Sequence, residues 1–316
     1  MHGEAWVNQA IQEADLLLAF GMRFDDRVTG DPKTYAPAAR KVHADIDRAE
    51  IGKNVAVDTA LVGDLTDTLR ELLDAIEPAE HAAWVQHIQN LKGKAAVRDI
   101  QQMPDSGHLY AAHAIHDIWR ITNGRAVVTT DVGQHQMWEA QYYRHESPMS
   151  LITSGGLGTM GFGLPAAIGA KIARPDAEVW AIVGDGGFQM TQAELATLAQ
   201  ERLKINIAII NNGYLGMVRQ WQEFFYNSRY SATPISSPDF VKLAEAHGLC
   251  GLRVENRRDV EQAVRRAREL PESVVIDFRV EQEDSVYPLV PAEASLSDMI
   301  RRPDGSVLVE TGSDPG

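Results

Sequence analysis

The sequence predicts an α/β protein whose strands form a mostly parallel sheet. Short apolar runs, such as residues 179–183 and 205–210, alternate with longer segments in which apolar residues repeat at helical spacing. The runs end in glycine, Asp or Asn, which is typical of buried parallel strands that feed tight turns. Because helical segments separate most of these runs, crossover connections between parallel strands are the natural arrangement.

One strand–helix–strand unit carries two candidate metal ligands. Its first strand, residues 179–183, stops at a glycine-rich turn around Asp185, a helix is expected over 191–201, and its second strand, 205–210, ends near Asn212. Both side chains then lie at the carboxyl ends of strands, where open α/β sheets bind ligands. Carboxylate and amide oxygens suit Mg²⁺, and glycines let the backbone approach a phosphate. Either motif by itself is more often an ordinary turn, whereas the pair within one unit is more specific.

Composition and charge narrow the class of protein. The chain has 316 residues, enough for two domains, and its 44% hydrophobic and 23% charged residues are typical of soluble globular proteins. The net charge of −14 argues against nucleic acid or an anionic membrane as partner. Cys250 is the only cysteine, which suits a reducing compartment. Without an apolar run of membrane-spanning length or the pattern of a signal peptide, we expect a cytoplasmic protein.

Residues 1–78 are expected to be the C-terminal part of an α/β domain. A helix over 5–13 precedes a strand over 15–20, and the remaining expected elements are a polar loop over 22–30, strands over 41–46 and 61–64, and a helix over 65–76. These few strands and helices are too few to bury a sheet on both faces. We therefore expect the domain to begin before Met1. Residues 79–105 are expected to form a mostly helical, polar linker.

Charged residues gather in the loops that follow these strands. Arg23, Asp25 and Arg27 come after the first strand, and Asp45 lies at the end of the second. Such loops suit a nucleotide, with Arg for phosphates and Asp for ribose hydroxyls. The charge pattern by itself favours another interpretation, a surface cluster of salt bridges.

Residues 106–316 are expected to form a second α/β domain with a C-terminal tail. A helix over 109–121 leads to a strand over 126–130, and a glycine-rich loop over 154–165 enters a helix over 166–172. Such a loop leaves amide N–H groups free for an anion. After the unit that carries Asp185 and Asn212, the expected elements are helices over 238–247 and 258–270, a strand over 274–278, and a tail from 286 that ends in a polar stretch.

Several motifs together resemble the large catalytic subunits of acetohydroxyacid (acetolactate) synthases, which are thiamine-diphosphate enzymes. The GDG and NN pair resembles the diphosphate-anchoring motif of the wider thiamine-diphosphate family. The further motifs are GMRFDDRVTG, TTDVGQHQMW, SGGLGTMGFGLPAAIGA, GDGGFQM, NNGYLGMVRQWQEFFYNSRYS and VYPLVP. The family's subunit has three α/β domains, and this chain resembles the end of the central, Rossmann-like FAD domain and all of the diphosphate-binding domain.

The resemblance implies a role for each matching residue. Asp185 and Asn212 would bind Mg²⁺ through their side chains, and Tyr214 through its backbone carbonyl. The residues implied around thiamine diphosphate are Gly133, Gln134, His135, Gly158, Gly184, Gly186 and Gly187, the last of which is more commonly serine in the family. Met160 would be the apolar prop that bends the cofactor, and Met217 and Trp221 would line the pocket of the second ketoacid. These three side chains are also of the kind that fill cores. The residues implied to contact FAD lie within 2–27 and 45–64 and include Gly21, Arg23, Asp25, Arg27, Asp45, Ile46 and Asp64.

The reaction that the resemblance implies is decarboxylation of pyruvate and carboligation to a second 2-ketoacid, pyruvate or 2-ketobutyrate. The products would be 2-acetolactate or 2-aceto-2-hydroxybutyrate, on the route to branched-chain amino acids. The cofactors implied are thiamine diphosphate, Mg²⁺ and FAD. The family's site lies between subunits, so the resemblance implies a homodimer or higher oligomer, together with a small regulatory subunit. In the family an activating glutamate comes from the first domain of a neighbouring subunit, so we expect this chain to be inactive without that domain.

Three other functions stay open at this point. The first is another thiamine-diphosphate carboligase, such as a catabolic acetolactate synthase without FAD or a glyoxylate carboligase. The second is a non-catalytic module that keeps the fold and serves in nucleotide or cofactor binding or in assembly. The third, a hydride-transferring dehydrogenase, is disfavoured because the glycines of 155–163 do not form GxGxxG directly after a strand.

Overall fold

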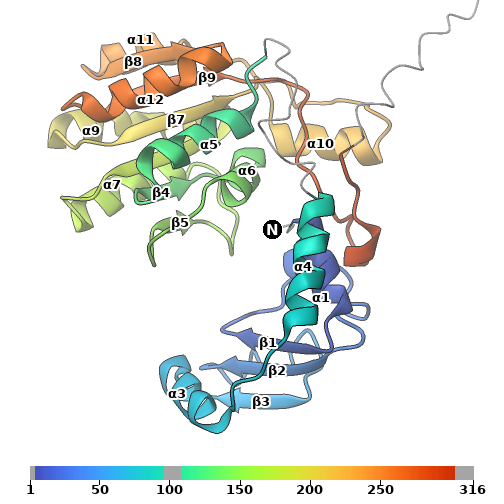
Figure 1. Cartoon of the computed structure of the whole chain (residues 1–316). Helices are drawn as coiled ribbons and strands as arrows, with labels where there is room; N and C mark the ends of the chain where they lie inside the picture. Colours follow the sequence, from blue (N-terminus) through green and yellow to red (C-terminus); the bar gives the residue numbers. More distant parts are fainter. Residues whose placement is uncertain (1–3, 96–107, 303–316) are drawn as a thin grey trace, which may run out of the picture. The chain divides into compact units, whose positions relative to one another are not determined.

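The computed structural model describes residues 4–95 and 108–302, which form two compact units (Figure 1). The first unit comprises 4–95 with 287–302, and the second comprises 108–286. The sequence placed the segment after Val286 in the second domain, whereas its residues pack in the first unit. Val290 and Leu296 lie in the same small core as Phe24 and Tyr35.

The first unit is built on a three-stranded parallel sheet in the order β1-β2-β3. Its strands are β1 (Leu16–Phe20), β2 (Arg40–Asp45) and β3 (Thr59–Val62). Its helices are α1 (Ala5–Glu13), α2 (Asp26–Thr29), α3 (Leu65–Ala75), α4 (Ala82–Ala95) and the 3-10 turn η5 (Leu296–Asp298). The order and type of these elements follow the sequence prediction, except that α2 lies inside the segment predicted as a polar loop. The predicted linker contains α4, and residues 96–105 fall outside the described residues.

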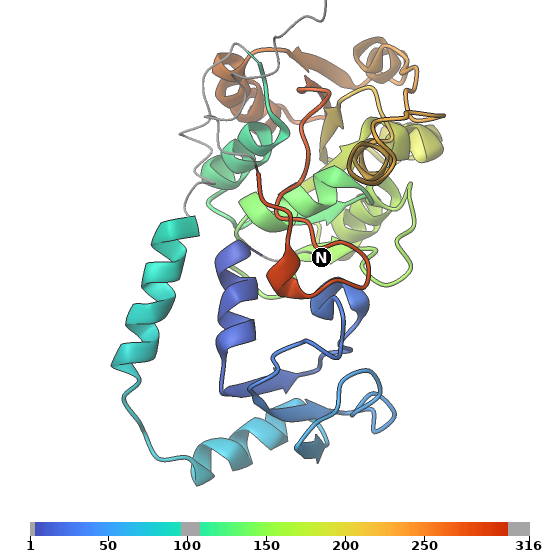
Figure 2. The ribbon, with the colours of Figure 1, turned by 90° about the vertical axis from the view of Figure 1, so that its right-hand side faces the viewer.

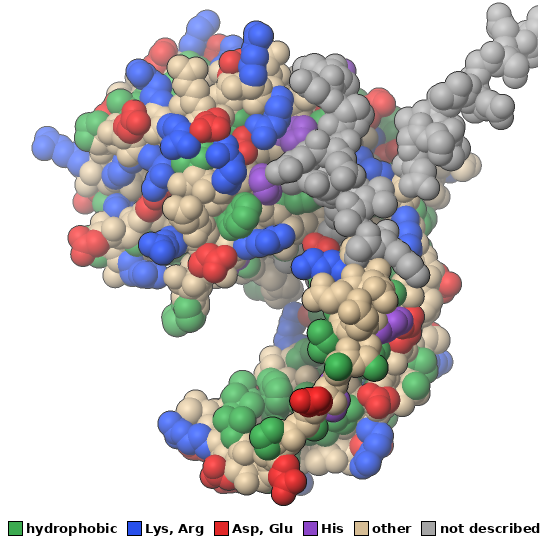
Figure 3. Space-filling model, viewed as in Figure 1, with side chains coloured by type: hydrophobic (Ala, Val, Ile, Leu, Met, Phe, Trp, Pro, Cys, Tyr) green, Lys and Arg blue, Asp and Glu red, His purple; other side chains and the backbone are tan. Residues whose placement is uncertain are grey.

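The two faces of this small sheet differ in how they are covered. Ala19 and His43 point into the core that contains Phe24, and both are buried. Leu16 and Leu18 of β1 point to the face opposite to that of Ala19, and they are 52% and 43% exposed. Hydrophobic side chains accordingly show on the surface of this unit in Figure 3.

The second unit is a six-stranded parallel sheet in the order β5-β4-β6-β7-β9-β8. Its strands are β4 (Val127–Thr130), β5 (Leu151–Thr153), β6 (Val179–Gly184), β7 (Asn206–Asn211), β8 (Cys250–Val254) and β9 (Val274–Arg279). Its α-helices are α5 (Ala111–Thr122), α6 (Gln134–Tyr142), α7 (Gly163–Ala173), α8 (Asp185–Thr191), α9 (Leu195–Glu201), α10 (Gly216–Phe225), α11 (Phe240–Ala246) and α12 (Val260–Glu269). The 3-10 turns η3 (Gln192–Glu194) and η4 (Arg257–Asp259) precede α9 and α12.

Alternate residues of the central strands feed two separate cores. Trp180 and Ile182 of β6 pack with α5, α6 and α12, whereas Ala181 and Val183 pack with α7, α9 and α11. Helices therefore cover both faces of the sheet (Figures 1 and 2). Burial on both faces explains why these strands are apolar at successive positions rather than at every second one.

Several elements of the second unit differ from the sequence prediction. α8 begins at Asp185 itself, where a turn was predicted, and the predicted helix over 191–201 is a 3-10 turn followed by α9. α6 begins at Gln134, shortly after the end of β4, and was not predicted. α10 and the edge strands β5 and β8 were not predicted.

Candidate functional site

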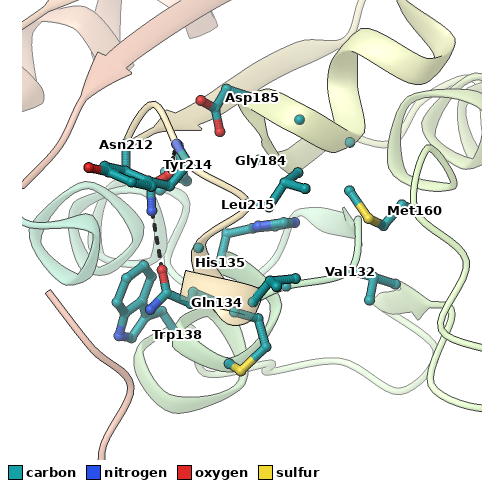
Figure 4. Close-up of a pocket in the computed structure, with 17 residues that line it drawn as sticks. Val132, Gln134, His135, Trp138, Met160, Gly184, Asp185, Asn212, Tyr214 and Leu215 are labelled. Carbon is teal, nitrogen blue, oxygen red and sulfur yellow. Dashed lines mark hydrogen bonds between the residues drawn. The ribbon is translucent and has the colours of Figure 1, made fainter. Parts of the chain in front are cut away.

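Neighbouring strands carry two of the predicted metal ligands, Asp185 and Asn212, to one edge of the sheet. β6 and β7 pair in parallel with Gly184 opposite Ile210, so Asp185 and Asn212 leave the sheet at adjacent points. The turn after β7 folds back on Asp185, whose Oδ2 accepts a hydrogen bond from the N–H of Gly213 over 2.9 Å. Gly213 has a φ of +71°, a left-handed conformation that favours glycine. Asp185 therefore contacts the turn that follows Asn212 (Figure 4).

Asp185 is a buried carboxylate whose hydrogen bonds come from neutral groups. Its side chain accepts hydrogen bonds from Gly213 N–H and, over 3.4 Å, from the hydroxyl of Ser237. Burial raises the pKa of Asp185 to about 6, although these donors and the N–H of Gly186 act in the opposite direction. A buried carboxylate of this kind is stabilised by a cation, which fits the predicted Mg²⁺.

Asn212 is oriented by hydrogen bonds at both ends of its amide. Its Oδ1 accepts from the N–H of Tyr214 over 3.1 Å, and its Nδ2 donates to Oε1 of Gln134 over 3.2 Å. Gln134 in turn donates to Oε1 of Gln220 over 2.9 Å and to the carbonyl of Asp284. Gln134, the first residue of α6, therefore links the turn after β7 to α10.

Two glycines at the site let side chains approach the backbone. A Cβ on Gly187 would overlap the carboxylate of Asp131, and a Cβ on Gly216 would overlap Oε1 of Gln134. Asp131 Oδ1 accepts from the N–H of Gly161 over 2.8 Å, which fixes the glycine-rich loop next to Met160. A side chain at either position would therefore require Asp131 or Gln134 to move from its present place.

A pocket opens between these elements. The residues that line it are Val132, Gly133, Gln134, His135, Trp138, Met160, Gly184, Asp185, Gly186, Gly187, Ile210, Asn212, Tyr214, Leu215, Gly216, Met217 and Val218. Burial lowers the pKa of His135 to about 3, so its ring is neutral near pH 7. Within the described residues, the Nε2 atom of His135 has no hydrogen-bond partner.

The pocket gathers most of the predicted residues of the second domain. Two predicted residues, Gly158 and Trp221, are not among those that line it. Trp221 packs its ring against Phe225 on α10 with 4.9 Å between ring centroids. Their implied roles stay predictions.

Several lining residues were not predicted. Trp138, Leu215 and Gly216 lie within the motifs that carry the family resemblance but were given no role in the site. A glycine at 216, two residues after the predicted ligand Tyr214, was the available signal. Ile210 could not be distinguished from the other apolar residues of β7 by sequence alone.

The residues predicted to contact FAD lie in the first unit. Gly21 follows β1, Asp45 ends β2, and Asp64 follows β3 and caps α3 by accepting from Thr66 N–H. The carboxyl ends of the three parallel strands bring them to one edge of that sheet. Arg23 forms an exposed salt bridge with Asp25 over 2.7 Å, so the surface-cluster interpretation also describes this loop. Arg27 and Ile46 are exposed as well, and His2 lies outside the described residues.

The donor set of the pocket suits one divalent cation beside an anionic group. One carboxylate, one amide oxygen and backbone oxygens are hard ligands that leave positions for phosphate and water. The described residues contain no cluster of three His, Cys, Asp or Glu side chains that could hold a metal unaided. Such a site needs a ligand that brings oxygens of its own, and the apolar side chains of Met160 and Leu215 offer a surface for an uncharged ring.

Two family descriptions match the chain. "Thiamine pyrophosphate enzyme, C-terminal TPP binding domain" matches residues 131–278, and "Thiamine pyrophosphate enzyme, central domain" matches residues 1–72. The first match contains the strand ends and turns that form the pocket. The second contains the three-stranded sheet.

Named relatives match nearly the whole chain. It is 48% identical over 312 residues to the acetolactate synthase large subunit of Mycobacterium tuberculosis, covering 95% of this chain and 50% of the relative. It is 46% identical to the acetolactate synthase large subunit of Corynebacterium glutamicum over 311 residues, 95% of this chain and 49% of the relative. It is 40% identical to chloroplastic acetolactate synthase 1 of Nicotiana tabacum over 319 residues, 96% of this chain and 47% of the relative. The chain thus spans about half the length of these relatives.

No helix within residues 4–95 and 108–302 is both long enough and apolar enough to cross a membrane.

Proposed function

The chain belongs to the thiamine-pyrophosphate enzymes, and from this we propose that it acts as the cofactor-binding half of an acetolactate synthase large subunit. The observation that carries the proposal is the meeting of Asp185 with the turn after Asn212, inside the segment that matches the cofactor-binding domain. The reaction proposed is decarboxylation of pyruvate and transfer of its two-carbon unit to pyruvate or 2-ketobutyrate.

The residues that would hold the cofactor follow from the pocket. Asp185, Asn212 and the carbonyl of Tyr214 would bind Mg²⁺, which would link the protein to the diphosphate. Backbone N–H groups around Gly133, Gly186 and Gly187 would face the phosphate oxygens. When bound, thiamine diphosphate supplies the carbanion that attacks a ketoacid, and the protein supplies orientation.

The remaining pocket residues would shape the reaction space. Met160 and Leu215 give an apolar surface next to Gly186 that would support a ring and exclude water. Met217 lines the pocket and would contact the acceptor ketoacid. Trp221 lies one helical turn further along α10, and its proposed contact with the acceptor rests on the family resemblance.

The resemblance also supports FAD, a homodimer or higher oligomer, and a small regulatory subunit as parts of the working enzyme. Gly21, Arg23, Asp25, Arg27, Asp45, Ile46 and Asp64 would contact FAD at the carboxyl edge of the three-stranded sheet. A cytoplasmic location is proposed on the single cysteine, Cys250, which suits a reducing compartment.

The first experiment is a calorimetric titration of the 316-residue chain with thiamine diphosphate in the presence of excess MgCl₂. We expect saturable binding that disappears when EDTA replaces MgCl₂, and at least tenfold weaker binding in Asp185→Ala. Equal binding by wild type and Asp185→Ala would remove the metal assignment.

A second experiment tests the reaction itself. The chain, loaded with thiamine diphosphate, Mg²⁺ and FAD, is incubated with pyruvate, with and without the N-terminal half of the Mycobacterium tuberculosis relative. We expect 2-acetolactate only when both pieces are present. Cofactor binding without any product in either mixture would favour a non-catalytic binding module.

A further inference from the structure

A short segment crosses over the turn that carries the cation ligands. We call residues 233–237 the strap; they follow α10 and an exposed loop and precede α11. Asp239 caps α11 by accepting from Val241 N–H and Lys242 N–H, and Arg253 donates to the same carboxylate over 2.7 Å. The strap is therefore anchored at its C-terminal end.

The strap pairs with the turn as an antiparallel strand would. Leu215 N–H donates to the carbonyl of Thr233 over 2.8 Å, and Ile235 N–H donates to the carbonyl of Gly213 over 2.9 Å. Tyr214 thus stands opposite Pro234 at a position without mutual hydrogen bonds. Pro234 fits there because a proline has no N–H to donate.

This register determines where the carbonyl of Tyr214 points. At such a position the N–H and C=O of a residue are directed away from the partner strand. The N–H of Tyr214 indeed donates to Oδ1 of Asn212, on the side away from the strap. The strap therefore leaves the carbonyl of Tyr214 turned from Pro234 and available to a ligand.

The strap also contacts the predicted ligand Asp185, through the side chain of Ser237. The hydroxyl of Ser237 donates to Oδ2 of Asp185 over 3.4 Å, the oxygen that also accepts from Gly213 N–H. Gln189 of α8 donates to Ser237 Oγ over 3.4 Å, which orients the hydroxyl. Ile235 adds an apolar contact above Gly186, next to Leu215.

We propose that Ser237, carried by the strap, is a positioning residue that fixes the carboxylate of Asp185 for the cation. The inference rests on the proposed function, because it takes Mg²⁺ with thiamine diphosphate as the occupant of the pocket. Two of the three predicted ligands, Asp185 and Tyr214, are held by this one segment. Without the hydroxyl, the carboxylate keeps its bond to Gly213 but gains freedom to rotate.

The test uses the two adjacent serines of the strap. Ser237→Ala removes the hydrogen bond to Asp185, whereas Ser236→Ala makes the same chemical change at an exposed neighbour. Ser237→Thr keeps a hydroxyl. Each full-length variant is titrated by calorimetry with MgCl₂ and, separately, with CaCl₂ at saturating thiamine diphosphate, and its melting temperature is measured without cofactor and metal.

We expect Ser237→Ala to bind Mg²⁺ roughly threefold to tenfold more weakly, the loss of about one hydrogen bond. Its affinity for Ca²⁺ should fall less, because Ca²⁺ tolerates irregular coordination and Mg²⁺ does not. The ratio of Mg²⁺ to Ca²⁺ affinity should therefore drop in Ser237→Ala and stay at the wild-type value in Ser236→Ala and Ser237→Thr. The melting temperature without metal should fall only slightly, because the hydrogen bond that is lost is long.

Two results would overturn the inference and are distinct from each other. If wild type binds Mg²⁺ with the cofactor and Ser237→Ala keeps the wild-type ratio, the positioning role is wrong and the proposed function stands. If wild type shows no Mg²⁺-dependent binding, the strap inference and the proposed function fail together.

Discussion

Burial of the Asp185 carboxylate lowers the free energy of unfolding of the protein when no cation is bound. Its pKa is about 3.8 in an unfolded chain and about 6 in the folded protein, because burial penalises the charged form. Between these values the folded state holds a proton that the unfolded state has released. The free energy of unfolding therefore falls as pH rises from about 4 to 6, and the full penalty is present at pH 7.

Asp185→Asn should remove that penalty. We expect the variant to be more stable than wild type by about 1–3 kcal/mol at pH 7 without cofactor, and by much less at pH 4. Urea denaturation at the two pH values measures the difference. The same variant should lose Mg²⁺-dependent cofactor binding, so a gain in stability without a loss of binding would contradict the assigned role.

His135 should make stability depend on pH in the opposite direction. Its pKa is about 6.5 when unfolded and about 3 when folded, because the ring is buried. Below pH 6.5 the unfolded state takes up a proton that the folded state refuses, so stability is lost as pH falls. At pH 5.5 the loss should be roughly 1 kcal/mol relative to pH 7.5, and it should be absent in His135→Phe. Parallel urea curves for both proteins test this.

Residue types predicted the chemistry of the site better than its packing. Asp185 and Asn212 could be predicted because each is a residue with a side-chain oxygen that comes just after an apolar run. This pattern is visible in a single sequence. Leu215 and Trp138 could not be predicted, because the sequence does not distinguish an apolar residue that lines a pocket from one that lies in a core. Distinguishing them requires knowing which elements lie side by side.

At the scale of elements, helix α10 shows why the local pattern was insufficient. Its buried residues are Arg219 and Gln220, whereas Val218 and Phe225 are 48% and 38% exposed. Arg219 donates to the carbonyls of Glu283 and Asp284, and Gln220 exchanges two hydrogen bonds with Val286. The core side of this helix is polar because it faces a chain segment rather than a sheet, which inverts the usual amphipathic signal.

The start of α8 was predicted wrongly for a related reason. Glycines at 186 and 187 predicted a loop because glycine is a poor helix former. The helix nevertheless begins at Asp185. Gly187 lies against the carboxylate of Asp131, and Gly186 lies against Leu215 and Ile235, so the packing around both positions favours glycine. Tertiary packing therefore overrides propensity where the pocket is built.

Gly216 gives a test of this packing. A Cβ at this position would meet Oε1 of Gln134 and, at 2.7 Å, Nδ2 of Asn212. We expect Gly216→Ala to lower the free energy of unfolding by about 1–3 kcal/mol and to weaken cofactor binding. The matched control is Gly169→Ala on α7, where nothing lies within 4 Å and alanine should stabilise the helix by up to about 1 kcal/mol. Two variants of equal stability would contradict the steric role of Gly216.

At the scale of the whole molecule, the two units carry separate sets of predicted residues. The residues that line the pocket lie between Val132 and Val218, all within the second unit. The residues proposed for FAD lie between Gly21 and Asp64, all within the first. Each ligand should therefore stabilise its own unit, because a ligand that binds only the folded form protects the contacts around it.

Hydrogen exchange can separate the two effects in one experiment. Thiamine diphosphate with Mg²⁺ should slow exchange in α6, in α8 and in the turn after β7, and leave β1 to β3 unchanged. FAD should slow exchange in the loops after β1 and β2 and leave the pocket unchanged. In Asp185→Ala the first effect should disappear while the second persists, which controls for general damage to the fold. Protection by thiamine diphosphate that appears first at the three-stranded sheet would place the cofactor in the other unit and contradict the site derived from Asp185 and Asn212.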